Sequence, residues 1–327
     1  MLIFATRYGG EELDNTMTVH EGEQKYKRLG WKKLTICLIV EAIALGSLSI
    51  PSAFAAVGMV AGVLLTVGIG LIAIYTSYVV GQVKLRHTHV EHYADAVRLI
   101  WGKFGYELAG AMFAGLLILL VGSHVLTGTI ALNRIVHDPS ICALAWGAIS
   151  AIVLFALALP PSFHEFAFLG YIDFVSILLA IGVTMIASGI EASHAPGGLS
   201  AVDWTLWPPP DMEFYEAFLA VTNIVFAYSF SVCQYSFMAE MHTPKDYVKS
   251  IWALGLMEIF IYTLTGGIIY SFIGSKVSSP ALLSTSTTVS RVAFGIALPV
   301  IFISGSINGT VVARYIMNRA FPNSEIK

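Results

Sequence analysis

The stretch Gly46-Ser47-Leu48-Ser49-Ile50-Pro51 interrupts the centre of a long apolar segment, roughly residues 34–57. The segment is long enough to cross a bilayer as one helix, for which about 20 apolar residues suffice. Its middle nevertheless carries small polar residues and a proline, which lacks the N–H group that a helix interior needs. Transporters bind substrates at interrupted spans, because unwound backbone there lines a cavity. The stretch therefore predicts a broken transmembrane helix with a binding site at the break.

The composition is that of an integral membrane protein. Of the 327 residues, 56% are hydrophobic and 12% are charged, whereas a soluble domain of this size needs a charged exterior. The net charge of -3 and the lack of a basic tract with interleaved aromatics exclude a nucleic-acid partner. The three cysteines stand far apart, so neither a disulfide framework nor a metal site is predicted. No cofactor is expected, and the lipid bilayer is the environment.

Hydropathy along the chain predicts eight membrane-spanning segments. They cover roughly residues 34–57, 60–83, 106–130, 141–159, 168–190, 214–238, 250–274 and 289–314. Backbone groups in lipid must be satisfied within each segment, so an all-α fold is expected. Residues 87–105 mix apolar and charged side chains and predict an interfacial helix.

The distribution of positive charge predicts the orientation. With a cytoplasmic amino terminus, every Lys and Arg falls on the inner side except Arg134, Lys276 and Arg291. The positive-inside rule therefore predicts that both termini are cytoplasmic. We expect the plasma membrane rather than the vacuolar membrane, although the sequence carries no decisive targeting motif.

Five helices separate the starts of the first and sixth spans, so the two run in opposite directions, as in an inverted repeat. The sixth span has small polar residues and aromatics at its middle, over residues 223–231. If both helices unwind, their free N–H and C=O groups face a cavity, and a half-helix amino terminus can hold a carboxylate. Alternatively, Ser229 and Ser231 hydrogen-bond to carbonyls of their own helix.

Four blocks of sequence carry a common signature. They are residues 46–54, 123–127 with 130–133, 223–228 continuing to 240, and 279–282 followed by 292–299. Together these blocks resemble the fungal branch of the amino acid/auxin permease family, from about residue 26 to residue 321. The resemblance implies a proton-coupled carrier of neutral, aliphatic or aromatic, amino acids. It also implies the five-plus-five inverted-repeat (LeuT-like) fold, which is also seen in sodium-coupled amine transporters.

The resemblance also implies a substrate site. The backbone of residues 46–49 (Gly46, Ser47, Leu48, Ser49) would receive the carboxylate and ammonium groups of an amino acid. Phe226, Tyr228 and Ser229 would line the opposite wall. Phe230 and Ser231 depart from the Gly and His that relatives commonly carry, which adds bulk and removes a permissive backbone position.

Ionisable residues inside a membrane are costly unless they are paired or functional. Glu41 lies on the inner side of the first break and is the first candidate for the proton-coupling group. Asp173, Glu258 and His124 are weaker candidates for proton relay. For each of the four, the alternative is a hydrogen-bonded packing or vestibule residue.

These observations divide the chain into segments. They are a cytoplasmic tail 1–33, a first repeat 34–190, an extracytoplasmic loop 191–213, a partial second repeat 214–314 and a short tail 315–327. The expected function is secondary active transport of neutral amino acids by alternating access, driven by protons. The inverted-repeat fold needs ten helices and this chain supplies eight. The alternative is therefore a truncated, non-transporting membrane protein or fragment, such as a regulatory or binding partner of a full-length carrier. No nucleophile elbow, Walker loop or zinc-binding His-Glu-x-x-His helix is present, so an enzyme is not expected.

Overall fold

The computed structural model describes residues 29–43, 46–136, 140–159 and 163–321, with the backbone alone for 163–168. The described chain is helical, and its only extended pairing is a lone parallel bridge between Leu29 and Met241. The helices are α2 (Trp31–Ala42), α3 (Gly46–Val57), α4 (Met59–Arg86), α5 (Tyr93–Val136), α6 (Ala143–Leu157), α7 (Phe163–His194), α8 (Phe214–Ala227), α9 (Gln234–Ala239), α10 (Tyr247–Ile273) and α11 (Thr287–Ala320). Five short 3₁₀ turns join them: η1 (Gly198–Ala201), η2 (Ser229–Ser231), η3 (Pro244–Asp246), η4 (Gly274–Lys276) and η5 (Ala281–Ser284).

Five of the described helices are long and apolar enough to cross a membrane, namely α4, α5, α7, α10 and α11. The pair α2 and α3 makes a sixth span if the two are taken as one bent helix. Helices α6 and α8 are apolar but shorter. Each of the eight predicted segments is largely helical where the structure describes it, whereas the predicted count of eight spans is not confirmed, since α6 and α8 fall short of the length of a full span.

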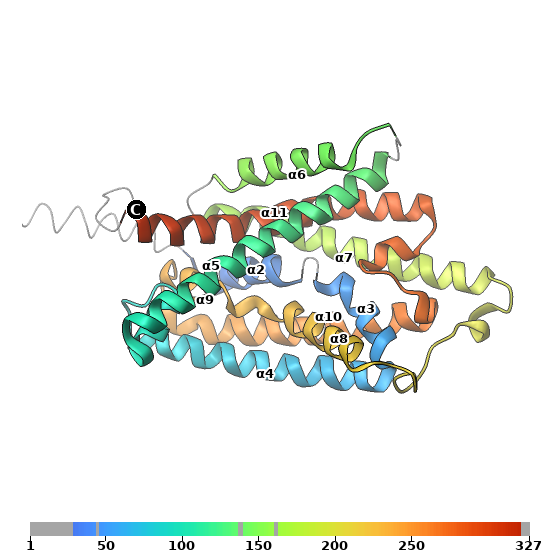
Figure 1. Ribbon diagram of the computed structural model, residues 1–327, viewed down its shortest axis with the longest axis horizontal. Helices are drawn as coiled ribbons and strands as arrows, with labels where there is room; N and C mark the ends of the chain where they lie inside the picture. Colours follow the sequence, from blue (N-terminus) through green and yellow to red (C-terminus); the bar gives the residue numbers. More distant parts are fainter. Residues whose placement is uncertain (1–28, 44–45, 137–139, 160–162, 322–327) are drawn as a thin grey trace, which may run out of the picture.

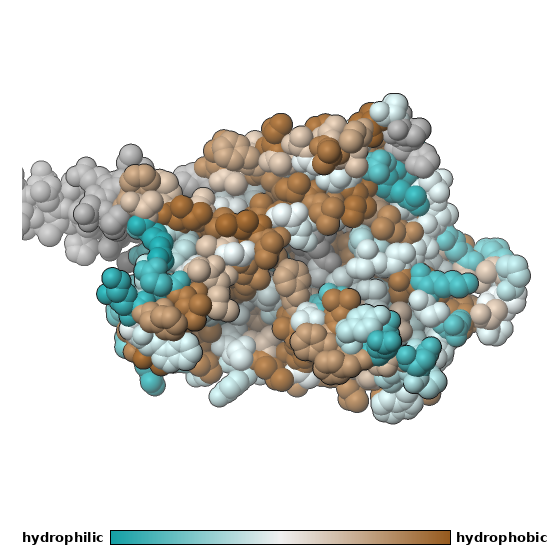
Figure 2. All heavy atoms as spheres, viewed as in Figure 1, coloured by the Kyte–Doolittle hydropathy of each residue, from teal (hydrophilic) through white to brown (hydrophobic). Residues whose placement is uncertain are grey.

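The long helices run along the long axis of the molecule (Figure 1). Hydrophilic residues gather at the two ends of this axis, and hydrophobic residues cover most of the visible face between them (Figure 2). Large apolar side chains such as Tyr75, Leu119, Phe155 and Phe260 are exposed. Exposed apolar surface of this extent is typical of a lipid-facing belt.

Helix α11 forms the centre of the bundle. Its most apolar window is 67% buried, against at most 39% for the other long helices. It packs against α5, α7 and α6, while α10 packs against α4 and α3. The run Ser304-Gly305-Ser306 lies buried on α11, and small residues let helices approach closely in membranes.

The first break differs in position from the sequence-based prediction. Helix α2 ends at Ala42 and α3 begins at Gly46, with a bend of 50° between them, and residues 44–45 lie outside the described part. Residues 46–51 form the first turns of α3 rather than an unwound segment. The hydroxyls of Ser47 and Ser49 are donated to the carbonyls of Ile43 and Gly46, which satisfies these polar groups inside helical structure.

The predicted interfacial helix is the start of α5, which begins at Tyr93 and continues to Val136. Gly102 adopts φ 61° and ψ -144° inside it. Glycine occupies this conformation without the steric cost that a Cβ would add. Two helices therefore meet at a kink at Gly102 within α5, and the first of them lies in the predicted interfacial segment.

Candidate functional site

The sixth predicted span is also interrupted. Helix α8 ends at Ala227, a 3₁₀ turn follows over Ser229–Ser231, and α9 begins at Gln234. The amide N–H of Tyr228 donates to both the carbonyl of Ile224, at 3.3 Å, and the carbonyl of Val225, at 3.2 Å. Such three-centre bonds are common where a helix tightens at its end. Two apolar helical segments far apart in sequence are thus broken near their middles.

The two breaks meet in space. Helix α3 packs against α8 (Figure 1). A Cβ atom built on Gly46 would lie 3.0 Å from both the Cα and the Cβ of Ala227. A glycine is therefore needed at position 46 for α3 to approach the end of α8 this closely.

The predicted site residues fall into two groups. Ser47 and Leu48 are buried at the start of α3, and Tyr228 is buried directly after Ala227. Gly46, Ser49 and Ser229 are half-buried. By contrast, the side chain of Phe226 is 45% exposed, and the structure does not bring it together with the others.

Helix ends of opposite polarity meet at the two breaks. The first N–H groups of α3, from Gly46 onward, have no partner within their own helix, so this end carries partial positive charge. The last carbonyls of α2 and α8, up to Ala42 and Ala227, carry partial negative charge. One region thus offers opposite polarity to a carboxylate and to an ammonium group.

Tyr262 of α10 lies between the two helix ends. Its hydroxyl is 2.7 Å from the carbonyl oxygen of Ala42, 3.1 Å from that of Ala227 and 3.4 Å from Oε1 of Glu258. Its ring makes an edge-on contact with the ring of Tyr228, with 5.0 Å between centroids. Sequence reasoning missed Tyr262, although its position four residues after Glu258 places both on one helix face.

Glu41 is the penultimate residue of α2 and lies directly before the first break. Its carboxyl group contacts the thiol of Cys233, whose sulfur is also 3.6 Å from Oδ1 of Asn308 on α11. Oε2 of Glu41 is buried and has no hydrogen-bond partner among the described residues. This row of polar groups joins the first break, the second break and the central helix.

The remaining ionisable candidates lie on three different helices. Asp173 of α7 is fully buried, and neither carboxyl oxygen has a hydrogen-bond partner in the described chain. His124 of α5 is buried against Gly305 of α11, with its Nδ1 likewise unpartnered. Glu258 of α10 is fully buried. Of the three, it is the one in hydrogen-bond contact with Tyr262 in the described chain.

One end of the molecule ties the two broken helices together. The amide of Leu29, before α2, donates to the carbonyl of Glu240, after α9, at 3.0 Å, and the amide of His242 donates to the carbonyl of Leu29 at 3.1 Å. The carboxylate of Glu240 is 2.8 Å from a guanidinium nitrogen of Arg314 on α11. The segments that lead into α2 and out of α9 are therefore fixed to each other and to the central helix.

At the other end, a loop covers the junction of α3 and α4. The amides of Met59 and Val60 donate to the carbonyls of Thr205 and Leu206, both at 2.9 Å. The hydroxyl of Tyr270 accepts a hydrogen bond from the amide of Thr205 at 2.9 Å. Both ends of the broken first span are thus held by hydrogen bonds.

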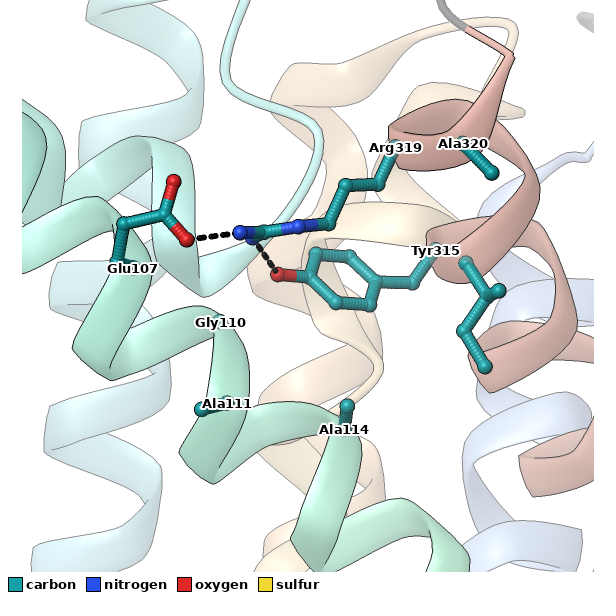
Figure 3. A pocket seen from close by; sticks show the side chains of 8 residues that line it. Glu107, Gly110, Ala111, Ala114, Tyr315, Arg319 and Ala320 are labelled. Atoms are coloured by element: carbon teal, nitrogen blue, oxygen red, sulfur yellow. Dashed lines mark hydrogen bonds and ion pairs between the residues drawn. The ribbon is translucent and has the colours of Figure 1, made fainter.

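A cavity of about 490 Å³ lies elsewhere, between the first part of α5 and the end of α11 (Figure 3). Small residues of α5, including Gly110, Ala111 and Ala114, form one wall, and Tyr315 and Arg319 of α11 form the other. The guanidinium group of Arg319 donates to the carboxylate of Glu107 and, at 3.1 Å, to the hydroxyl of Tyr315. The cavity contains none of the predicted site residues, so its size alone does not make it the substrate site.

Comparison with known proteins agrees with this architecture. A family model described as transmembrane amino acid transporter protein matches residues 27–327. The chain is 60% identical over 320 residues to the N amino acid transport system protein of Neurospora crassa, covering 98% of this chain and 68% of the relative. It is 28% identical over 302 residues to a transmembrane transporter of Fusarium pseudograminearum, covering 92% of this chain and 63% of that protein.

A plant relative is more distant. Amino acid permease 8 of Arabidopsis thaliana is 26% identical over 268 residues, covering 73% of this chain and 55% of the permease. The chain spans about two thirds of the length of its fungal relatives. The family resemblance inferred from the sequence is confirmed, as is the expectation of a transporter rather than an enzyme. The chain belongs to the transmembrane amino acid transporter family.

Proposed function

We propose that this chain moves neutral amino acids across a membrane by secondary active transport, coupled to protons. The family supports amino acids as the class of substrate. The printed name of the fungal relative, an amino acid transport system protein, agrees with this. The observation that carries the proposal is the meeting of two broken helices at Gly46 and Ala227.

The substrate site lies at this meeting point. The amino-terminal end of α3, over Gly46, Ser47 and Leu48, carries partial positive charge and binds the substrate carboxylate. The carbonyl ends of α2 and α8 face the ammonium group. Ser49, Tyr228 and Ser229 border the same region, and Phe226 reaches it only after a side-chain or helix movement, since its ring is exposed here.

Neutral side chains are favoured by the surroundings. Leu48 and Tyr228 are buried next to the breaks, and none of the ion pairs between described residues lies there. A charged substrate side chain would lose its hydration there, and the buried carboxyls of Glu41 and Glu258, held neutral, offer no opposite charge. Burying an isolated charge in this way costs on the order of several kcal/mol. An aliphatic or aromatic side chain carries no charge, so its burial involves no such desolvation cost.

Glu41 is the proposed proton-coupling group. Its buried, unpartnered Oε2 makes the ionised form costly in this conformation, so the carboxyl is held neutral. A rearrangement that gives Glu41 access to water releases the proton. Because Glu41 is next to the last residue of α2, movement at the break changes its surroundings directly.

Alternating access requires the two ends of the break region to open in turn. The Leu29–Glu240 pairing closes the end that we place in the cytosol, and the loop around Thr205 closes the opposite end. The plasma membrane is the proposed location. In this structure both ends are tied, as in an intermediate between the inward-open and outward-open forms.

Uptake of labelled leucine and phenylalanine by cells that express this chain tests the proposal. Cells that carry the empty vector and cells that express a surface-localised, unrelated membrane protein are the controls. We expect uptake that unlabelled neutral amino acids inhibit and that lysine and aspartate do not. Uptake equal to the vector control, with the chain shown to be in the membrane, would contradict transport. Equal inhibition by lysine or aspartate would contradict the neutral specificity.

A further inference from the structure

The hydroxyl group of Tyr262 has more acceptors around it than it has protons. It can donate one hydrogen bond, yet the carbonyl oxygens of Ala42 and Ala227 and Oε1 of Glu258 all lie within 3.4 Å. The two carbonyls terminate α2 and α8, which are the helices broken at the proposed substrate site. A single side chain of α10 therefore contacts both breaks.

The protonation state of Glu258 decides where the tyrosine proton goes. A neutral Glu258 can donate its own proton to the tyrosine oxygen, which leaves the tyrosine O–H free to bond the helix-end carbonyls. An ionised Glu258 is the strongest acceptor of the three, because hydrogen bonds to charged groups are roughly twice as strong as neutral ones. Ionisation therefore draws the tyrosine proton away from the carbonyls.

We propose that Tyr262 is a latch between the two broken helices and that the protonation of Glu258 closes it. With Glu258 neutral, α2 and α8 share one hydroxyl and are held together. With Glu258 ionised, the carbonyls of Ala42 and Ala227 lose their donor and the helix ends are released. The latch rests on the proposed transport function, because it links proton binding to movement at the substrate site.

The surroundings of Glu258 favour the neutral form in this structure. Its Oε2 is buried without a hydrogen-bond partner in the described chain, and no ion pair between described residues involves it. Glu41 is close enough to oppose a second negative charge. Titratable groups with described side chains lie on the elements packed against α10. They are Lys32, Lys33 and Cys37 of α2; Tyr75, Tyr78, Lys84 and Arg86 of α4; Tyr171, Asp173, Glu191 and His194 of α7; and Lys245, Asp246 and Lys276 in η3 and η4. Tyr228, after α8, contacts the ring of Tyr262.

Hydrogen–deuterium exchange of the purified full chain, followed by mass spectrometry, measures the latch without relying on transport. The informative amides are those of Ile43, bonded to Ile39 at 2.9 Å, and Tyr228, bonded to Ile224 at 3.3 Å. After correction for the intrinsic pH dependence of exchange, we expect both to lose protection together as the pH rises. The expected loss is about fivefold, the effect of one hydrogen bond on an equilibrium.

Two isosteric variants assign the effect. Tyr262→Phe removes the hydroxyl but keeps the ring, and we expect low protection at both helix ends at every pH. Glu258→Gln keeps a neutral side chain, and we expect high protection that no longer depends on pH. The double variant should match Tyr262→Phe alone, because Glu258 acts through the tyrosine.

The matched control is Tyr247→Phe. Tyr247 lies on the same helix with the same burial, and its hydroxyl donates to the carbonyl of Tyr78 on α4 at 2.8 Å, far from the breaks. This variant should keep the pH dependence at both helix ends. Glu41→Gln should also keep a pH dependence, moved to lower pH because the opposing charge is removed. This separates the latch from the proposed proton-coupling group.

The proposal is wrong if Tyr262→Phe leaves protection at either helix end unchanged, or if Glu258→Gln retains the pH dependence. Failure of the transport proposal looks different. In that case the unmodified chain shows no amino-acid uptake, while exchange at Ile43 and Tyr228 still depends on pH through Tyr262.

Discussion

Gly46 of α3 contacts the backbone of Ala227 at the end of α8, at a distance that admits no side chain on residue 46 without displacement. This contact brings the start of one half-helix beside the end of another. The start of the first carries partial positive charge and the end of the second partial negative charge. In the proposed function this pair of helix ends binds the carboxyl and amino groups of the substrate, so few side chains need to carry specificity for them.

Gly46→Ala tests this contact. The added Cβ lies 3.0 Å from two atoms of Ala227, and overpacking of this kind costs about 1–3 kcal/mol. We expect the two helix ends to separate and the KM for neutral amino acids to rise, with a smaller change in maximal rate. Labelled leucine uptake over a range of concentrations provides the measurement.

Gly68→Ala is the matched control for Gly46→Ala, because a Cβ at Gly68 of α4 would meet nothing within 4 Å. Its uptake should equal that of the unmodified chain. If Gly46→Ala and Gly68→Ala behave alike, the contact with Ala227 has no role in binding.

Glu41→Gln tests proton coupling. Glutamine keeps the size of the side chain but cannot exchange a proton. We therefore expect uptake that no longer varies with external pH, while exchange of internal for external amino acid continues. A variant whose uptake keeps the pH profile of the unmodified chain would reject Glu41 as the coupling group.

Removal of the ion pair between Glu240 and Arg314 tests whether this pair stabilises the end of the molecule where Leu29 is bonded to Glu240. Glu240 is buried, and the side chain of Arg314 is 30% exposed. Breaking a buried pair leaves one charge uncompensated, so Glu240→Gln should lower the free energy of unfolding by about 3 kcal/mol, the low end for such pairs. Thermal denaturation in detergent measures the loss.

The exchanged pair Glu240→Arg with Arg314→Glu serves as the control for this prediction. It restores opposite charges and should recover part of the stability lost by either single change. Single and double variants with equal stability would show that the pair does not hold this end closed.

His92, which precedes α5, makes stability depend on pH. Burial lowers the pKa of His92 below its usual value of 6.5, against the opposing effect of Asp95 and Glu91, with Lys84 and Arg314 adding to the lowering. The folded state thus holds fewer protons than the unfolded state below that value. Stability from this group is therefore complete above pH 6.5 and is lost as the pH falls below it.

Melting temperatures measured across this range check the His92 prediction. His92→Gln should flatten the decline between neutral and mildly acidic pH, whereas His194→Gln, at the exposed end of α7, should leave it unchanged. An equally steep decline in His92→Gln would assign the acid sensitivity to other groups.

The class of fold could be predicted from composition, because 56% hydrophobic residues cannot be buried in a soluble chain of this size. Each of the eight apolar segments is largely helical in the described residues. The number of spans is not confirmed, because hydropathy does not show how long a helix each segment forms, and α6 and α8 are short. Whether the two halves are related by an inverted repeat stays a prediction.

The position of the first break shows the limit of local reasoning. Small polar residues and Pro51 suggested unwinding over residues 46–51, yet α3 continues through the proline. The hydroxyl of Ser49 donates to the carbonyl of Gly46 in the same helix, and that of Ser47 donates to the carbonyl of Ile43 at the end of α2. The break instead follows Ala42, where nothing in the local sequence marks it. Tertiary contacts such as Tyr262 on Ala42 stabilise that helix end.

Contacts across long sequence separations could not be predicted at all. Glu240 and Arg314 are separated by 74 residues, and no local pattern relates them. Tyr262 could have been found from its spacing to Glu258, but its contact with Ala42 spans 220 residues. These pairings depend on how the helices pack, which a single sequence does not show.

The central claim is tested most directly by purified protein in liposomes under an imposed pH gradient. With the outside more acidic, we expect labelled leucine or phenylalanine to accumulate above the external concentration. A protonophore that collapses the gradient should release the accumulated substrate. Accumulation that is absent in liposomes containing the folded chain, or that is unaffected by the protonophore, would contradict proton-coupled transport of neutral amino acids.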